Sequence, residues 1–181
     1  MVETTDEVVS IENEPLILVD EADCEIGSLS KTECHDGDGV LHRAFSIFVF
    51  NDRGELLLQR RSAEKRLWPL FWSNSCCSHP RQGESMADAT SRRLHQELGI
   101  ETELDHLFTF SYHTRYLELG SEHEMCWVYA GHSDDEPRFN TREIAEVRWI
   151  SPVGLDREFA TRPKVFTPWF EREWPRVRES V

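Results

Sequence analysis

Residues 76–100 read CCSHPRQGESMADATSRRLHQELGI, and this stretch decides how the chain is organised. Its second half predicts a helix over residues 86–98, since Ser85 is a favourable N-cap and Asp88 follows three residues later. Gly99 then supplies a C-terminal stop. Because both ends are chemically well marked, we place one firm helix near the middle of the chain.

The segments around this helix are rich in aromatic and β-branched residues. Residues 16–19 are apolar and run into the turn-like residues 20–23, which predicts a first hairpin. Residues 44–50 and 55–60 flank the turn sequence Asn51-Asp52-Arg53-Gly54 and predict a second one. Further β-rich segments lie at residues 107–112, 126–131 and 146–150.

Strands, a capped helix and then more strands favour an α+β sandwich over a doubly wound sheet. A second, weaker helix is predicted within residues 163–177, where Pro168 and Pro175 interrupt the pattern. A chain of 181 residues can bury one substantial core, so we expect a single domain over residues 15–181. Residues 1–14 hold five acids and no base, and we expect a solvated, flexible acidic tail there.

The net charge of −14 argues against a protein that coats nucleic acid, because such binding depends on Lys and Arg neutralising phosphates. An anionic substrate would need a local basic pocket or a bound metal ion. Only three of the 20 basic residues are lysines. This composition is typical of halophilic proteins, in which salt screens strong self-repulsion, although a merely acidic protein is the alternative.

The five cysteines lack a regular disulfide-like spacing, which favours reduced thiols in a cytoplasm. The acidic N-terminus does not read as a secretory signal, and the most apolar window, residues 44–50, is too short to span a bilayer. We therefore expect a soluble cytoplasmic protein without a membrane or nucleic-acid partner, as a monomer or weak dimer.

Three histidines and two glutamates could form a metal site. His35 and His42 bracket a short Asp/Gly loop, and His79 lies in a Pro-bounded turn. Glu122 and Glu124 are two residues apart, so both carboxylates face the same side of a strand. Such a set suits Mg²⁺, Mn²⁺ or Zn²⁺, although histidines of ordinary surface or core type are the commoner alternative.

The helix and the turn before it carry further candidates. Cys76 suits the role of a small buried hydrophobe, whereas Cys77, beside a helix entry and a cationic cluster, would have its thiolate favoured. Arg93 and Glu97 share a helix face. They form either an exposed ion pair or a pair in which Glu97 holds a divalent ion and Arg93 an anion.

Several motifs together resemble the type 1 isopentenyl-diphosphate isomerases, a branch of the Nudix superfamily. The resemblance runs from about Leu16 to Trp169 and includes HDGDGVLHRAF (35–45), RRSAEKRLWPLFWSNSCCSHPRQGES (60–85), RRLHQELGI (92–100), SEHE (121–124) and TPWF (167–170). It implies a Nudix-type α/β/α sandwich with a mixed sheet and additional N-terminal strands.

The Nudix pattern has a glycine at the position of Ser78 and a glutamate at that of Glu84. Arg93 and Gln96 replace two acids that would bind catalytic metal in a hydrolase. This departure resembles the isomerase branch, which interconverts isopentenyl and dimethylallyl diphosphate. The alternatives are a Nudix pyrophosphohydrolase and a catalytically silent diphosphate-binding module.

The resemblance also assigns roles to individual residues. It implies a metal ion, Mn²⁺, Mg²⁺ or Zn²⁺, held by His35, His42, His79, Glu122 and Glu124. A second ion, Mg²⁺, would bridge the diphosphate to Glu97 and a backbone oxygen at Cys77. The diphosphate would bind Lys31, Arg61, Lys65 and Arg93. Cys77 and Glu124 match the opposed acid and base, Tyr112 matches the partner of the glutamate, and Trp169 matches an aromatic ring that stabilises a carbocation.

Overall fold

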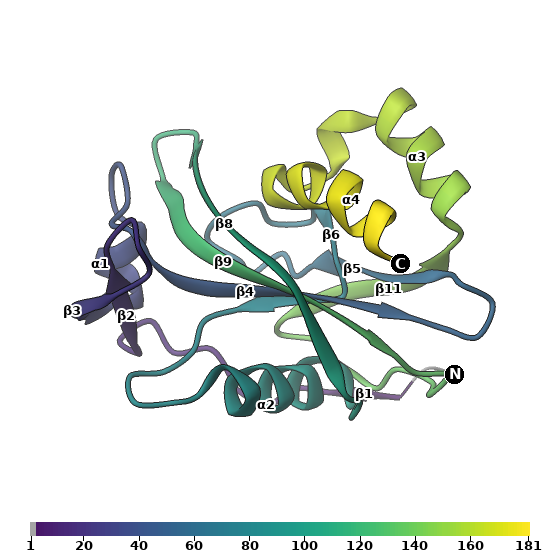
Figure 1. Ribbon diagram of the computed structural model, residues 1–181, viewed down its shortest axis with the longest axis horizontal. Helices are drawn as coiled ribbons and strands as arrows, with labels where there is room; N and C mark the ends of the chain where they lie inside the picture. The colour runs from purple at the N-terminus through teal and green to yellow at the C-terminus, as the bar shows by residue number, and fades with distance from the viewer. Residues whose placement is uncertain (1–2) are drawn as a thin grey trace.

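The computed structural model describes residues 3–181 and places a mixed β-sheet between helices (Figure 1). The strands are β1 (Thr4–Thr5), β2 (Pro15–Val19), β3 (Glu25–Ser30), β4 (His42–Phe50), β5 (Leu56–Arg61), β6 (Trp72–Ser73), β7 (Cys76–Ser78), β8 (Leu104–Tyr116), β9 (Gly120–His132), β10 (Phe139–Asn140) and β11 (Ile144–Ile150). The helices are α1 (Lys31–His35), α2 (Met86–Leu98), α3 (Pro152–Thr161), the 3-10 turn η1 (Pro163–Val165) and α4 (Pro168–Ser180). Helix α2 covers one face of the sheet and α3 and α4 the other, as the α/β/α sandwich predicts.

The central strand β4 is buried on both faces and positions the site. It pairs in parallel with β9 and antiparallel with β7, where Ser46 lies opposite Cys77. Phe45 and Ile47 belong to the apolar cluster under α2, while Phe48 belongs to the cluster under α4. Because successive side chains alternate between faces, Ser46 and its neighbour Cys77 face the α4 side.

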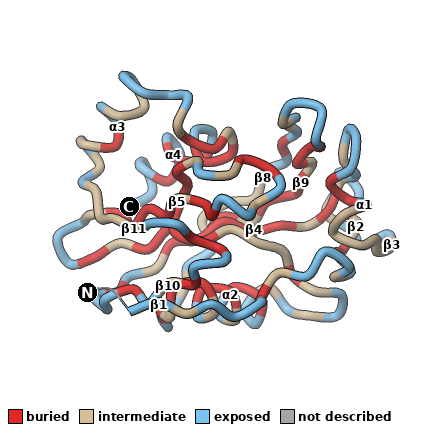
Figure 2. The backbone as a smooth tube through the Cα atoms, turned by 180° about the vertical axis from the view of Figure 1, so that it is seen from behind, coloured by how far each residue is buried: buried red, intermediate tan, exposed pale blue. Residues whose placement is uncertain are grey.

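Two apolar clusters hold the layers together, and Figure 2 shows the buried residues concentrated along the central strands. Between the sheet and α4 the cluster is largely aromatic, with Phe48, Tyr112, Trp169, Phe170 and Trp174. Between the sheet and α2 it is largely aliphatic, with Ile47, Val49, Leu57, Leu94 and Leu98. Within residues 3–181, no helix has the length and apolar character needed to cross a bilayer.

The predicted central helix is confirmed at both ends. The Ser85 hydroxyl accepts a hydrogen bond of 3.1 Å from the Asp88 backbone N–H, and Gly99 adopts a left-handed φ of 67°. An N-cap side chain satisfies one of the free N–H groups of the first turn, and glycine tolerates the left-handed C-terminal conformation. These local signals were enough to predict both boundaries of α2 from the sequence.

The first predicted hairpin is confirmed as β2 and β3, which pair antiparallel along their length. The second is confirmed only beside its turn, where Phe50 pairs with Leu56. Beyond that point β7 pairs with β4 and β6 pairs with β5, so the two strands separate. A turn sequence therefore predicts the connection between two strands but not how far they stay paired.

Three helices differ from the sequence prediction. Helix α1 is too short to produce a periodic pattern and is held by a capping box between Ser30 and Glu33. Helix α3 was not predicted. Helix α4 begins at Pro168, because proline suits the first helical turn, and it continues through Pro175. Pro168 is thus a start signal and not an interruption.

The acidic N-terminal segment is not a solvated tail. Residues 1 and 2 lie outside the described part of the chain, but β1 pairs in parallel with β10 and Val9 is buried. The Arg93 guanidinium donates a hydrogen bond of 2.8 Å to the Val9 carbonyl. Residues 4–10 therefore contact the domain, and the prediction of a solvated tail is wrong for Val9, whereas Asp6 and Glu7 are exposed to solvent. The flexibility of the segment stays a prediction.

Candidate metal centre and active-site cavity

Five side chains with nitrogen or oxygen ligand atoms meet at one edge of the sheet. His35 ends α1, His42 begins β4, His79 follows β7, and Glu122 and Glu124 come from β9. One ligand atom from each lies within 4.8 Å of the others. The structure thus brings together the complete set that the sequence singles out.

Backbone carbonyls orient two of the imidazoles. His35 Nδ1 lies 2.6 Å from the Lys31 carbonyl oxygen and His42 Nδ1 lies 2.7 Å from that of Val40. A carbonyl only accepts, so both Nδ1 atoms carry a proton. The Nε2 atom of His42 then has a free lone pair, while that of His35 lies 2.8 Å from Glu122 Oε2. Nδ1–H bonded to an acceptor, with Nε2 towards the centre, is the arrangement that supports metal-bound histidines.

The charge states of His79 and Glu124 also suit a cation. Burial, followed by the nearby His42 and His35, holds the pKa of His79 well below its usual value, so this imidazole is neutral. Burial would raise the pKa of Glu124, but its interactions with the neighbouring His42 and Tyr112 outweigh burial and lower that pKa. Neutral imidazoles and ionised carboxylates are the forms that bind metals.

The His42 ring provides a direct test of fit. Its Nε2 is fully buried, has no hydrogen-bond partner among the described residues and lies 3.7 Å from the nearest Glu124 oxygen. A buried polar atom without a partner costs free energy, so an additional group is expected there. The five residues fit a divalent cation bound through nitrogen and oxygen ligands.

The cluster forms one wall of a cavity of about 260 Å³. Its lining includes the predicted catalytic groups and the aromatic ring: Cys77, Tyr112, Glu124 and Trp169. It also includes the four predicted diphosphate-binding cations: Lys31, Arg61, Lys65 and Arg93. Residues 8–10 of the N-terminal segment cover part of the same cavity.

Glu124 belongs to both the cluster and the cavity. Its Oε1 lies 2.9 Å from His79 Nε2, while its Oε2 accepts a hydrogen bond of 2.5 Å from the Tyr112 hydroxyl. Burial and the Glu124 charge raise the pKa of Tyr112 well above its usual value, so the hydroxyl keeps its proton. One oxygen of Glu124 is thus oriented by an imidazole and the other by a phenol.

Cys77 is a thiol in this environment, contrary to the expected thiolate. Burial raises the pKa of Cys77 to about 12, although the Arg61 charge acts in the opposite direction. Arg61 Nη1 lies 3.9 Å from the Cys77 sulfur. The residue lies in β7, away from the first turn of α2, so the helix terminus does not favour its thiolate.

Comparison with known proteins identifies the family. The NUDIX domain model matches residues 40–170. The chain is 37% identical over 169 residues to isopentenyl-diphosphate Delta-isomerase 1 of Photorhabdus laumondii, covering 92% of this chain and 96% of that protein. It is 43% identical over 158 residues to the isopentenyl-diphosphate Delta-isomerase of Serratia proteamaculans, covering 87% and 88%. The chain belongs to the isopentenyl-diphosphate Delta-isomerase family.

Solved structures agree on the Nudix fold. A crystal structure of DR0079 from Deinococcus radiodurans superposes with a TM-score of 0.68 at 27% identity, covering 82% of this chain and 90% of that one. A MutT protein from Methanosarcina mazei superposes with a TM-score of 0.63 at 19% identity, covering 77% and 95%. The second likeness is one of fold alone.

In this member of the isomerase family, the first glutamate of the Nudix pattern, Glu84, is already engaged. Glu84 accepts hydrogen bonds from Arg92 and from the Arg81 backbone N–H. Ser78, at the glycine position of the pattern, lies in β7 in ordinary extended backbone, so no left-handed conformation demands glycine there.

Arg93 and Glu97 form a buried pair, which contradicts the exposed alternative. Both side chains are about 3% exposed, and Arg93 contacts only Oε1 of Glu97. Arg93 also donates to the Val9 carbonyl and, at 3.3 Å, to the Ser10 hydroxyl. Within residues 3–181, the cavity lining does not include Glu97. Its predicted part in binding Mg²⁺ remains a proposal.

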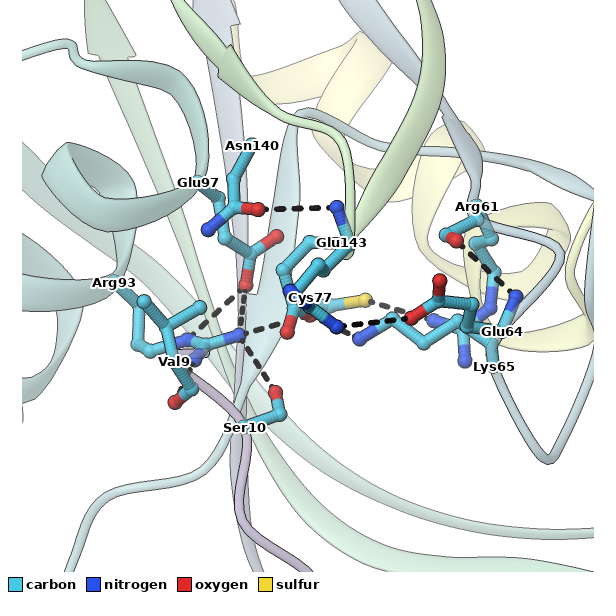
Figure 3. A network of polar contacts seen from close by, with 12 residues as sticks. Val9, Ser10, Arg61, Glu64, Lys65, Cys77, Arg93, Glu97, Asn140 and Glu143 are labelled. Carbon is cyan, nitrogen blue, oxygen red and sulfur yellow. Dashed lines mark hydrogen bonds and ion pairs between the residues drawn. The ribbon is translucent and has the colours of Figure 1, made fainter. Parts of the chain in front are cut away.

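Sequence reasoning missed Glu143, which lies among the cavity's cations. Its Oε2 forms an ion pair with Lys65 and accepts a hydrogen bond of 3.2 Å from Arg93 Nη2 (Figure 3). Burial alone would raise the pKa of Glu143, but the charges of Lys65 and Arg93 hold that pKa well below its ordinary range. Its partners lie 78 and 50 residues earlier in the chain, so no local motif marks it.

Proposed function

We propose that this chain interconverts isopentenyl diphosphate and dimethylallyl diphosphate, a step that supplies precursors for isoprenoid biosynthesis. The observation that carries the proposal is the cavity, which combines a partly buried thiol, a tyrosine-bonded carboxylate and an aromatic ring with four cations. The names of the relatives support the same reaction. Moving a double bond needs an acid, a base and a dry pocket, and it leaves the diphosphate intact.

The diphosphate binds at the basic part of the cavity, through Lys31, Arg61, Lys65 and Arg93. Cations concentrated there offset the repulsion that a chain of net charge −14 exerts on an anion. Glu97 and the main-chain oxygen of Cys77 would hold Mg²⁺, which would neutralise diphosphate charge. Arg93 uses one oxygen of Glu97 and makes no contact with the other.

The hydrocarbon end lies between Cys77 and Glu124. Glu124, assisted by Tyr112, adds a proton to the terminal methylene carbon C4, which leaves a tertiary cation at C3. Cys77 then removes a proton from C2, and the new double bond joins C2 and C3. The face of Trp169 stabilises the cation, an interaction worth on the order of 2 kcal/mol in a desolvated site.

The protonation states of Cys77 and Glu124 before substrate binds determine which direction of the isomerisation can start under each assignment of acid and base. The Cys77 pKa of about 12 and the lowered Glu124 pKa give a thiol and a carboxylate. Under our assignment these are the states from which dimethylallyl diphosphate is converted back. If the two roles were exchanged, they would instead be the states that start from isopentenyl diphosphate.

Deuterium exchange separates the two assignments. If Glu124 protonates C4, Cys77→Ala incubated with isopentenyl diphosphate in D₂O incorporates deuterium at C4 without forming product, because the cation returns its proton to Glu124. If Cys77 is the acid at C4, this variant shows no exchange there. Proton NMR of recovered substrate reads the result directly.

The three histidines and two glutamates hold one divalent ion, Mn²⁺, Mg²⁺ or Zn²⁺. When bound, this ion supplies positive charge that fixes the Glu124 carboxylate and adjusts its affinity for a proton. The unpartnered His42 Nε2 and the carbonyl-bonded Nδ1 atoms support the proposal. Metal analysis of the purified protein, set beside activity after reconstitution with each ion, identifies the ion.

The central experiment incubates the purified protein with isopentenyl diphosphate and Mg²⁺ and follows proton and phosphorus NMR. Dimethylallyl diphosphate with an intact diphosphate supports the proposal. Release of phosphate without isomerisation would establish a pyrophosphohydrolase, and binding without turnover would establish a silent binding module. We expect Cys77→Ala and Glu124→Gln to abolish isomerisation while diphosphate binding survives, and turnover retained in either variant would refute the assigned roles.

We propose that the protein is a monomer or weak dimer, which light scattering tests.

A further inference from the structure

Glu143 is an acid in the part of the cavity that the proposed function reserves for an anion. The Glu143 side chain is 4% exposed and that of Lys65 is 20% exposed, and the two form an ion pair. Arg93, 3% exposed, donates to the same Glu143 oxygen. A carboxylate here opposes diphosphate binding by charge, so its presence needs another explanation.

The neighbouring cations repel one another. Burial lowers the pKa of Lys31, the charges of Lys65 and Arg93 lower it further, and the charge of Glu143 raises it. Two of the chain's three lysines, Lys31 and Lys65, lie in this one cavity. Without an anion, mutual repulsion and desolvation would favour moving the most flexible of these side chains into solvent.

Lys65 is the side chain that depends most on Glu143. Arg93 has a second carboxylate, Glu97, and two further acceptors in the N-terminal segment. Lys65 forms no other ion pair within residues 3–181. Its side chain has four rotatable bonds, so the ammonium group can turn outwards once this ion pair is lost.

The backbone fixes Glu143 against the loop that carries Lys65. The Glu143 carbonyl accepts a hydrogen bond of 2.9 Å from the Ser62 N–H, and the Lys65 N–H donates in turn to the Ser62 carbonyl at 3.2 Å. The Glu143 N–H donates to the Asn140 carbonyl at 3.1 Å. The backbone of Glu143 is therefore fixed by hydrogen bonds, so its carboxylate can determine the position of the Lys65 side chain.

We propose that Glu143 is a positioning residue, a resident counter-ion that keeps Lys65 and Arg93 inside the cavity until a diphosphate takes over their charges. The inference rests on the proposed function for the identity of the anion. Glu143 touches neither the reacting carbons nor the acid and base. Its loss weakens diphosphate binding and leaves the chemical step unchanged.

Glu143→Gln tests this with the smallest change of shape, because the amide keeps the volume of the side chain and loses the charge. In the metal-loaded enzyme, we expect the Kd for inorganic diphosphate, measured by calorimetry, and the KM for isopentenyl diphosphate to rise about tenfold. We expect kcat to stay within about threefold. An unchanged or tighter Kd would overturn the proposal, since the carboxylate would then only repel the ligand.

A double-mutant cycle separates positioning from general stability. If Glu143 acts through Lys65, Glu143→Gln has less effect on the Kd in a Lys65→Met background than in the wild type. Full additivity would refute this route. Glu146→Gln is the matched control, because Glu146 is exposed and pairs with Arg60 at 3.6 Å on the surface, and it leaves the Kd unchanged.

Glu143→Asp covers the case in which the glutamine variant fails to fold. It keeps the charge but draws the carboxylate back from Lys65, so its Kd for inorganic diphosphate lies above that of the wild type. Where Glu143→Gln also folds, the Kd of Glu143→Asp lies below that of Glu143→Gln. A Kd equal to that of the wild type overturns the proposal. If the wild type binds inorganic diphosphate but does not isomerise substrate, the proposed function fails while the binding measurements still decide the role of Glu143.

Discussion

Gly120→Ala should loosen the metal centre without altering any of its five ligands. Gly120 begins β9 with a φ of 152°, and a Cβ atom built there would lie 2.3 Å from the backbone oxygen of His35. A Cβ atom in contact with a carbonyl oxygen lies about 3.4 Å from it, so β9 and the end of α1 must separate by roughly 1 Å. His35 would move away from the cluster with its backbone.

Two effects set the size of the loss. Alanine at this φ adds strain of about 1–3 kcal/mol, and displacing a support of a metal ligand costs roughly 10–100-fold in metal affinity. For a chain of this size, that strain corresponds to a fall of roughly 2–12 °C in the unfolding midpoint of the metal-free protein. Competition with a chelator measures the affinity, and thermal unfolding of the metal-free protein measures the strain.

Gly54→Ala is the control, since Gly54 has a φ of 70° but nothing within 4 Å of the added Cβ. It should lose about 1 kcal/mol of stability and keep the wild-type metal affinity. If Gly120→Ala also binds metal as the wild type does, the close approach to His35 does not hold the centre together, and the reasoning is refuted.

Three further outcomes are expected. Burial raises the pKa of Glu173 to about 8 from 4.5, so the folded state keeps a proton that the unfolded state releases, and stability falls as the pH rises through this window. Glu173→Gln removes that loss, so denaturant titrations of the two proteins should diverge by about 1.4 kcal/mol per pH unit, and parallel curves would contradict the burial argument. Removing metal with a chelator should lower the unfolding midpoint, and an ion at a hundredfold excess over its Kd should restore about 2.7 kcal/mol. Raising salt from about 0.01 M to 1 M should stabilise a chain of charge −14 by screening, and an unchanged midpoint would remove the halophilic interpretation.

The parts of the fold that sequence predicts well are those with local causes. The boundaries of α2 follow from Ser85 and Gly99, whose effects act within one helical turn. The two glutamates of β9 face the same side because strand side chains alternate. Helix α1 was missed because five residues do not complete two turns, and its capping box at Ser30 was not recognised.

The parts that sequence predicts poorly depend on tertiary contacts. The Cys77 thiolate expectation failed because burial, which no spacing reveals, raises the pKa more than Arg61 lowers it. The N-terminal segment looked solvated because its acids are numerous, yet Val9 packs inside and its carbonyl binds Arg93. Glu143 could not be predicted as a site residue, because its charge partners come from distant segments of the chain.

The cavity also explains how so acidic a chain can hold an anion. Two of its four cations pair with carboxylates that oppose the ligand's charge, with Glu97 on Arg93 and Glu143 on both Arg93 and Lys65. Each acid weakens the bare attraction but keeps a flexible cation from turning towards the acidic surface. If this balance is correct, removing Glu143 sacrifices affinity even though it makes the pocket more positive, whereas a purely electrostatic pocket would gain affinity. The sign of that one change distinguishes a pocket that works by net charge from one that works by placement.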